Sequence, residues 1–241
     1  MNRLMQSLVN PLVAIAALAL SAGCGSETLP PGRGATEAGL AEQIAAVERG
    51  ESTRIEIAET VLGDADAAVI GKVVGLKELL VDHPESRFSV AGIASLAALP
   101  HLEHLRIRGP SIDNGCLTEL ARCEKLRILN VPQGSFDDDG LAALAELPHL
   151  VQLRFGSPDV TDRGMQMLDG FPALLRLHLI DVPITDAGLI ELAKIERLQS
   201  LYIDGGNLTD AGWEELFRLR PKLHVHVNQQ HHDRDPHKHP H

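Results

Sequence analysis

The stretch LLRLHLIDVPITDAGLIELAKIERL, residues 174–198, contains one complete unit of the pattern that organises the chain. It opens with the alternation L-R-L-H-L, and this two-residue period is typical of a β-strand with one buried face. Residues 186–195 follow with apolar residues at helical spacing. Thr185 or Asp186 suits the N-terminus of that helix, because a side-chain oxygen caps free backbone N–H groups and a carboxylate favours the positive end of the helix dipole. The stretch predicts a strand, a turn and a short helix.

The same unit recurs every 24 residues. The pattern L-x-x-L-x-(apolar) opens at five leucines, each 24 positions after the one before: Leu102, Leu126, Leu150, Leu174 and Leu198. Two more copies lie upstream, opening at Ser52 and Leu76, and the second carries a two-residue insertion around Pro84. A closing strand is expected at Leu223, Val225 and Val227. Because no unit can bury its apolar face alone, the units must stack. The sequence predicts an α/β solenoid of about seven repeats, with a curved parallel sheet on the concave side and short helices on the convex side.

These repeats resemble the leucine-rich repeat proteins. The linking stretches from Val160, Ile184 and Leu208 are similar to the I-T-D-x-G-L form of bacterial and cysteine-containing leucine-rich repeats. One departure is that the asparagine expected three residues after the third apolar position is absent. Pro110, Gly134, Pro158, Val182 and Gly206 occupy that position. We therefore expect no asparagine ladder inside the solenoid.

The N-terminus has the features of a cellular address. A single basic residue, Arg3, precedes a short apolar run, and small residues precede Cys24, as in a secretory signal peptide. The segment from Leu20 to Cys24 also resembles the lipobox of bacterial lipoproteins, with Ser21 in place of the usual leucine. That resemblance implies a signal peptide over residues 1–23, lipidation of Cys24 and a membrane anchor in the bacterial cell envelope, with the outer membrane or periplasmic face favoured. An ordinary signal peptide that happens to contain a cysteine is the alternative.

The remaining boundaries follow from composition. Residues 24–38 are rich in Pro and Gly and predict a flexible tether, whereas residues 39–51 predict an N-terminal capping helix. The solenoid then covers residues 52–228. Residues 229–241, rich in histidine and interrupted by prolines, predict a disordered tail.

Several function classes are disfavoured. The chain has 241 residues with 22 basic and 33 acidic side chains, a formal net charge of −11, which argues against a nucleic-acid-binding protein. Neither G-x-S-x-G nor H-E-x-x-H occurs, and Gly71-Lys72 lacks the Ser or Thr and the upstream glycine of a phosphate loop. Cys116 and Cys123 occupy helix positions too far apart for a disulfide and are expected to be buried thiols. We therefore expect no enzyme activity and no cofactor.

The concave face is the candidate binding surface. Its variable strand positions are rich in arginine and aromatic residues. Few acids share this face (Glu103, Asp181 and Asp204), because most acids fall on the outer helices. The candidate contact residues are Arg106, Arg108, Arg127, Arg154, Arg176, His104, His178 and Tyr202. Guanidinium groups bind carboxylates bidentately, so we expect a protein or acidic polymer as the partner. The alternative is that these positions are polar only because they contact water.

The tail offers a second candidate site. Its clustered imidazoles suit Zn, Ni or Cu, although their irregular spacing specifies no single tetrahedral site. The candidate metal ligands are His231, His232, His237, His239 and His241, and His224 and His226 lie just upstream. A solvated tail that binds divalent metal adventitiously is the alternative. The function hypotheses are thus a lipid-anchored interaction module, a metal-handling envelope protein and a purely structural lipoprotein.

Overall fold

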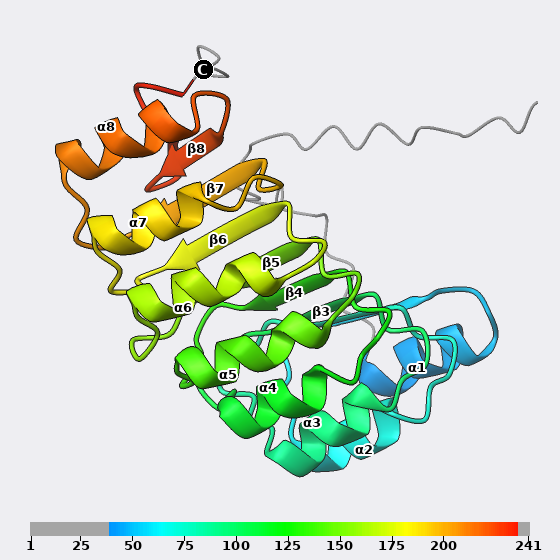
Figure 1. Ribbon diagram of the computed structural model, residues 1–241. Helices are drawn as coiled ribbons and strands as arrows, with labels where there is room; N and C mark the ends of the chain where they lie inside the picture. Colours follow the sequence, from blue (N-terminus) through cyan, green and yellow to red (C-terminus); the bar gives the residue numbers. More distant parts are fainter. Residues whose placement is uncertain (1–38, 236–241) are drawn as a thin grey trace, which may run out of the picture. The chain divides into compact units, whose positions relative to one another are not determined.

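The computed structural model describes residues 39–235, and all structural statements below concern these residues. Cys24 and the tail histidines His237, His239 and His241 lie outside them. The described chain forms one nine-stranded sheet in which the strands follow one another in chain order (Figure 1). The strands are β1 (Arg54–Ile57), β2 (Glu78–Val81), β3 (His104–Ile107), β4 (Ile128–Val131), β5 (Gln152–Phe155), β6 (Arg176–Ile180), β7 (Ser200–Asp204), β8 (His224–Val227) and β9 (Gln230–His231).

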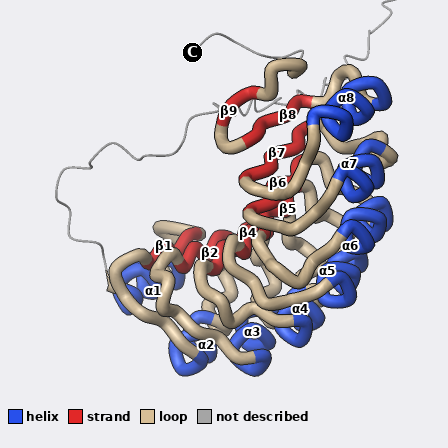
Figure 2. Tube along the Cα trace, turned by 90° about the vertical axis from the view of Figure 1, so that its left-hand side faces the viewer, coloured by secondary structure: helices blue, strands red, loops and turns tan. Residues whose placement is uncertain are grey.

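A short helix follows each of β1 to β7, and one further helix precedes β1. The helices are α1 (Leu40–Glu48), α2 (Asp64–Ile70), α3 (Val90–Ala97), α4 (Asn114–Leu120), α5 (Asp138–Ala143), α6 (Asp162–Met167), α7 (Asp186–Ala193) and α8 (Asp210–Leu219). Single 3-10 turns, Leu144–Glu146 and Leu168–Gly170, extend α5 and α6. Figure 2 shows the strands on the inner side of an arc and the helices on its outer side. The predicted leucine-rich-repeat solenoid is therefore confirmed.

The sheet register follows the 24-residue period. β1 to β8 are parallel, and Leu129, Leu153 and Leu177 pair in succession with their Cα atoms in register. The exception is β2, whose Leu79 pairs with Leu105, 26 positions later, because the insertion around Pro84 lengthens that repeat. Val225 pairs with Leu201, so the closing strand is in phase.

The core is a column of apolar side chains between sheet and helices. Buried and partly exposed residues alternate along β3 to β7, whereas β2 and β8 each bury two or more consecutive residues, and the buried leucines of neighbouring strands stack. The bulkiest fully buried side chains are four phenylalanines, Phe88, Phe136, Phe155 and Phe171. Cys116 and Cys123 are free and buried, as expected, and burial raises the pKa of their thiols to about 11 and about 12. These two cysteines are packing residues.

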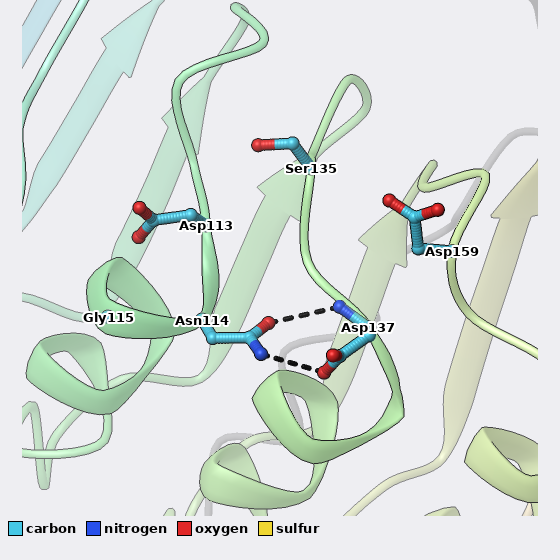
Figure 3. Close-up of a pocket in the computed structure, with 6 residues that line it drawn as sticks. All are labelled: Asp113, Asn114, Gly115, Ser135, Asp137 and Asp159. Carbon is cyan, nitrogen blue, oxygen red and sulfur yellow. Dashed lines mark hydrogen bonds between the residues drawn. The ribbon is translucent and has the colours of Figure 1, made fainter.

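Hydrogen bonds between successive helix N-termini replace the missing asparagine ladder. The first residue of a helix accepts from the residue that caps the next helix. For example, Thr185 donates its N–H and its hydroxyl to the two carboxylate oxygens of Asp162, at 2.8 and 2.6 Å. Asn114 bonds Asp137 in the same place (Figure 3). We call these first residues the bridging residues, and they are Asp64, Asn114, Asp138, Asp162 and Asp186. The choice left open by the sequence is thereby settled: Thr185 caps α7 by accepting from Ala187 N–H, and Asp186 bridges to Thr209.

Both ends of the sheet are covered. At the N-terminal end, the Gln43 side chain of α1 exchanges two hydrogen bonds, of 2.8 and 2.7 Å, with the Glu56 backbone of β1. At the C-terminal end the sequence predicted a disordered tail from residue 229, but the chain there forms a hairpin. Asn228 and Gln229 have φ of 48° and 66°, which makes a two-residue hairpin turn, and β9 returns antiparallel to β8. The histidine-rich segment is therefore ordered as far as Asp235.

Candidate binding surface

The concave face of the sheet presents two rows of side chains. The first row runs through the opening residues of the strands: Arg54, Glu78, His104, Ile128, Gln152, Arg176, Ser200 and His224. The second row lies two residues further along each strand: Glu56, Leu80, Arg106, Asn130, Arg154, His178, Tyr202 and His226. Because side chains alternate along a strand, both rows face away from the core. They form one surface across eight strands.

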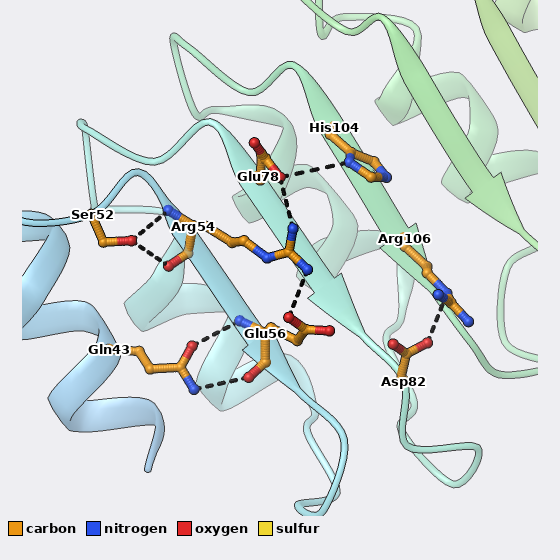
Figure 4. A network of polar contacts seen from close by, with 8 residues as sticks. All are labelled: Gln43, Ser52, Arg54, Glu56, Glu78, Asp82, His104 and Arg106. Carbon is orange, nitrogen blue, oxygen red and sulfur yellow. Dashed lines mark hydrogen bonds and ion pairs between the residues drawn. The ribbon is translucent and has the colours of Figure 1, made fainter. Parts of the chain in front are cut away.

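The N-terminal part of this surface is a network of opposite charges (Figure 4). Arg54 contacts Glu56 and Glu78, at 2.6 and 3.3 Å. Arg106 Nε lies 2.7 Å from Asp82 Oδ1. These acids lie in the repeats before Leu102, where the insertion around Pro84 interrupts the regular spacing, so the pattern from Leu102 onwards does not include them. The concave face is therefore more balanced in charge at this end than the sequence suggested.

The centre of the surface is positive. Burial lowers the pKa of Arg154, and the nearby positive charges of Arg106 and Arg108 lower it further, while Asp204 and Asp82 partly oppose this. Arg108 is exposed just beyond β3, and its guanidinium makes no ion pair with any residue in the described part of the chain. Arg106, Arg108 and Arg154 are close enough to repel one another. An anion that bound near them would therefore be stabilised.

A hydrogen-bonded chain crosses four strands beside this centre. The Arg154 side chain donates to Asn130 Oδ1 at 3.5 Å and to His178 Nδ1 at 3.1 Å, and His178 Nε2 lies 2.9 Å from Asp204 Oδ2. Since His178 Nδ1 accepts from Arg154, the ring proton is on Nε2 and is donated to Asp204. Burial is the main cause that lowers the pKa of His178, and Asp204 partly opposes it. The neutral ring fixes the position of Arg154.

The other predicted arginines lie apart from this centre. Arg176 is half-buried in the first row, two strands beyond Ile128. Arg127 is exposed at the margin of the sheet, just before β4. Neither side chain has an ion pair among residues 39–235. The predicted contact residues thus share the concave side without forming one contiguous patch.

The C-terminal part of the surface is aromatic. The Tyr202 ring stacks between His178 and His226, with centroid distances of 5.5 and 4.8 Å. His224 lies edge-on to Tyr202 at 6.0 Å. The sequence placed His224 and His226 just upstream of the candidate metal ligands and did not predict them on this face. Their H-x-H spacing nevertheless places both on one side of a strand. Tyrosine and histidine together give this end an amphipathic contact surface.

The predicted metal ligands separate in the structure. His231 lies on β9 with its side chain 6% exposed. His232 instead packs on Trp213 and Phe217, with ring centroids 4.8 and 5.0 Å away. His232 is therefore an anchor of the hairpin against α8, and its assignment as a metal ligand is not supported by its position.

An acidic pocket lies at the helix N-termini, away from the concave rows (Figure 3). Its carboxylates already serve the fold. Asp113 accepts from Cys116 N–H at 2.9 Å, and Asp137 accepts from Gly140 N–H at 3.1 Å. The bonds from Gly140 and Asn114 lower the pKa of Asp137. We assign this pocket to helix capping.

The fold and surface define a solenoid of the leucine-rich-repeat class. Among solved structures, an internalin C2 from Listeria monocytogenes is similar, with 18% identity, a TM-score of 0.51, and coverage of 76% of this chain and 83% of that chain. TLR13, solved as a complex with ssRNA13, is similar at 17% identity and a TM-score of 0.56. This chain matches only 27% of that structure's length, and the match covers 80% of this chain. At these identities the likeness concerns the fold.

Comparison with protein-family models gives no match, and neither does comparison with curated proteins. Among residues 39–235, none of the helices combines the length and the apolar character needed to cross a bilayer.

We expect the stability of the protein to fall on acidification in part through His178. Its pKa in the folded chain is below the ordinary value of 6.5. The unfolded chain therefore takes up a proton that the folded chain resists, and this contribution is present above pH 6.5 and is lost as pH falls through the folded pKa. Urea unfolding of wild type and His178→Gln at pH 7.5, 6.5 and 5.5 tests this. Wild type should lose more stability than the variant, by at most about 1.4 kcal/mol per pH unit. Because His104 and His232 are present in both proteins, parallel pH profiles would contradict the assignment.

Proposed function

We propose that this protein is a non-enzymatic, lipid-anchored interaction module of a bacterial cell envelope, which binds an acidic surface of a protein partner on its concave sheet. One observation carries the proposal. Several arginines lie on the concave side of a chain whose net charge is −11, and three of them, Arg108, Arg127 and Arg176, have no ion pair with a described residue. Cations without such partners are available to an external anion.

The geometry supports a protein carboxylate over a polyanion. Arg154 is held by His178 and Asn130, so its guanidinium is ordered before a ligand arrives. Ordered guanidinium groups bind carboxylates bidentately and are enriched in interface hot spots, as is tyrosine. Glu56, Glu78 and Asp82 lie on the same face and would repel a nucleic acid or another extended polyanion. The bound RNA of TLR13 is therefore not a guide to the partner of this chain.

A capture experiment with matched charge variants tests the proposal. The full-length protein is crosslinked in membranes, and captured proteins are compared by mass spectrometry. The concave variant carries Ala at Arg108, Arg127 and Arg176. The convex control carries Ala at Arg122, Arg163 and Arg218, each of which is paired with an acid on the helices. Both variants lose three positive charges, so they are matched in net charge and differ in the face affected and in the pairing of the arginines removed.

We expect the concave variant to lose at least about tenfold in capture of one specific protein and the convex control to retain it, since a hot-spot arginine contributes more than about 1 kcal/mol. Equal loss in both variants would indicate only long-range attraction, and no loss in the concave variant would contradict the surface assignment. The anchor is tested in the same membranes. Cys24→Ser should release the protein, and a variant that still sediments without an acyl label would contradict lipidation.

A further inference from the structure

Four potential metal ligands meet where the hairpin closes the sheet. His224 and His226 lie on β8, His231 lies on β9 opposite His226, and Asp235 follows β9 (Figure 2). The backbone holds the returning segment in place. His232 N–H donates to the Val225 carbonyl at 3.0 Å, and Asp235 N–H donates to the His232 carbonyl at 2.9 Å. This geometry brings residues from two strands and a turn to one point.

The ligand atoms are close together. One ligand atom from each residue lies within 4.8 Å of all the others. His224 Nε2 is 3.1 Å from His226 Nε2, while Asp235 Oδ2 is 3.0 Å from His224 Nδ1 and 2.9 Å from His231 Nδ1. In a tetrahedral zinc site with bonds of about 2.0–2.1 Å, neighbouring ligand atoms are about 3.3 Å apart. Because His224 can offer only one of its two ring nitrogens to an ion, not all three of these contacts can be ligand pairs of one site, but the ligand atoms of the four residues are close enough together to turn toward a single ion.

Most of the cluster is also shielded from water, although the His224 side chain is 21% exposed. His226 is 2% exposed, and the side chain of Asp235 is wholly buried. Three imidazoles and a carboxylate are ligands of the borderline type that suits Zn²⁺. Four ligands from the protein fill a tetrahedral shell, as in structural zinc sites, whereas catalytic sites keep a position open.

We propose that His224, His226, His231 and Asp235 form a structural Zn²⁺ site that clamps the C-terminal hairpin. The site lies at the C-terminal end of the concave face, where His224 and His226 also belong to the two rows, and it joins β9 and Asp235 to β8. Its effect would be to stabilise the C-terminal end of the sheet. The last parallel strand of a solenoid exposes unpaired backbone groups, and β9 pairs with part of them. An ion bonded to both sides of the hairpin would hold this short strand in place.

The test measures binding of Zn²⁺ alone to the metal-free, full-length protein by competition with a chromophoric chelator. Two variants change the site, His226→Gln and Asp235→Asn. The control variant changes the three tail histidines His237, His239 and His241 to Gln and leaves the site intact. Wild type and the control should bind one equivalent of Zn²⁺ tightly, and each site variant should bind at least 100-fold more weakly. X-ray absorption of the control should show three imidazole nitrogens and one oxygen at about 2.0–2.2 Å.

Thermal unfolding provides a second measurement, in which each protein is compared with itself in the presence and absence of Zn²⁺. Zn²⁺ should raise the Tm of wild type and of the control in a concentration-dependent way, because an ion that binds only the folded chain stabilises it by mass action. Circular dichroism checks that the site variants remain folded. Loss of the tight equivalent in the tail control, with normal binding by His226→Gln, would assign the metal to the tail and overturn the proposal. Absence of stoichiometric binding to wild type would overturn it as well.

Discussion

Gly92→Ala should lower the free energy of unfolding by about 2 kcal/mol, although alanine is the better helix former. A Cβ at this position would lie 2.1 Å from Oδ1 and 3.0 Å from Cγ of Asp64 in the preceding repeat. The clash would force the Asp64 side chain to move, although its two oxygens accept hydrogen bonds from Ser89, at 2.8 and 2.5 Å. Displacement would break both bonds, each of which contributes about 1–1.5 kcal/mol, with the steric cost added. Urea unfolding monitored by circular dichroism measures the change.

The sign of this effect should reverse when Asp64 is removed. In an Asp64→Ala background the carboxylate is absent, so alanine at position 92 gains its helix preference over glycine, about 1 kcal/mol, and clashes with little. A double-mutant cycle should therefore show a coupling of about 2–3 kcal/mol between the two positions. Additive effects of the two substitutions would show that the bridging residue and the glycine do not act together.

The sequence itself contains a natural version of this experiment. In one repeat the bridging position is Val90, and in the next repeat Cys116 takes the place that glycine holds in the other helices. A Cβ added at Gly140, Gly164 or Gly188 would lie only 2.2–2.5 Å from Oδ1 of a bridging residue. The glycine is required only where a bridging side chain lies against the helix. This relation explains why aspartate and glycine occur together in the T-D-x-G stretch.

The period predicted the fold because it reports an interaction that every repeat makes. The buried leucines stack in register, so their spacing alone determines the sheet order and the parallel direction. The bridging hydrogen bonds were not predicted, although their residues were visible. Thr185 and Asp186 both suit a helix N-terminus. Only the hydrogen bonds from Thr209, 23 residues after Asp186, show that Asp186 is the residue that bridges.

The candidate sites were predicted less completely, for two physical reasons. The acids Glu78 and Asp82 lie in the repeat that the Pro84 insertion shifts, so the regular spacing did not bring them into register with Arg106. The hairpin was missed because its composition is that of a solvated tail. Its order comes from the pairing of β9 with the adjacent β8 and from the stacking of His232 on Trp213 of the preceding helix. Local composition carries no signal for such contacts.

Arg220→Ala should be the most destabilising of the surface substitutions, at about 3 kcal/mol. Its guanidinium donates to backbone carbonyls at the end of α7 and in the turn after it. The acceptors are the carbonyls of Ala193, Ile195, Glu196 and Leu198. The last carbonyls of a helix have no partner within the helix, and a hydrogen bond to a charged group contributes about 1.5–3 kcal/mol. Alanine would leave several of these partly buried acceptors without a donor.

Arg218 provides the matched control two residues away. It lies in the last turn of α8, and within residues 39–235 its side chain pairs only with Glu215, one helical turn earlier. Because its side chain is 66% exposed, Arg218→Ala should change the free energy of unfolding by less than about 0.5 kcal/mol. Arg220→Lys should fall between wild type and Arg220→Ala, since a single ammonium keeps the charge but cannot reach four carbonyls. Equal unfolding midpoints in urea for the two alanine variants would contradict this role of Arg220, whereas a lower midpoint for Arg220→Ala alone would show that one side chain joins the last two helical repeats.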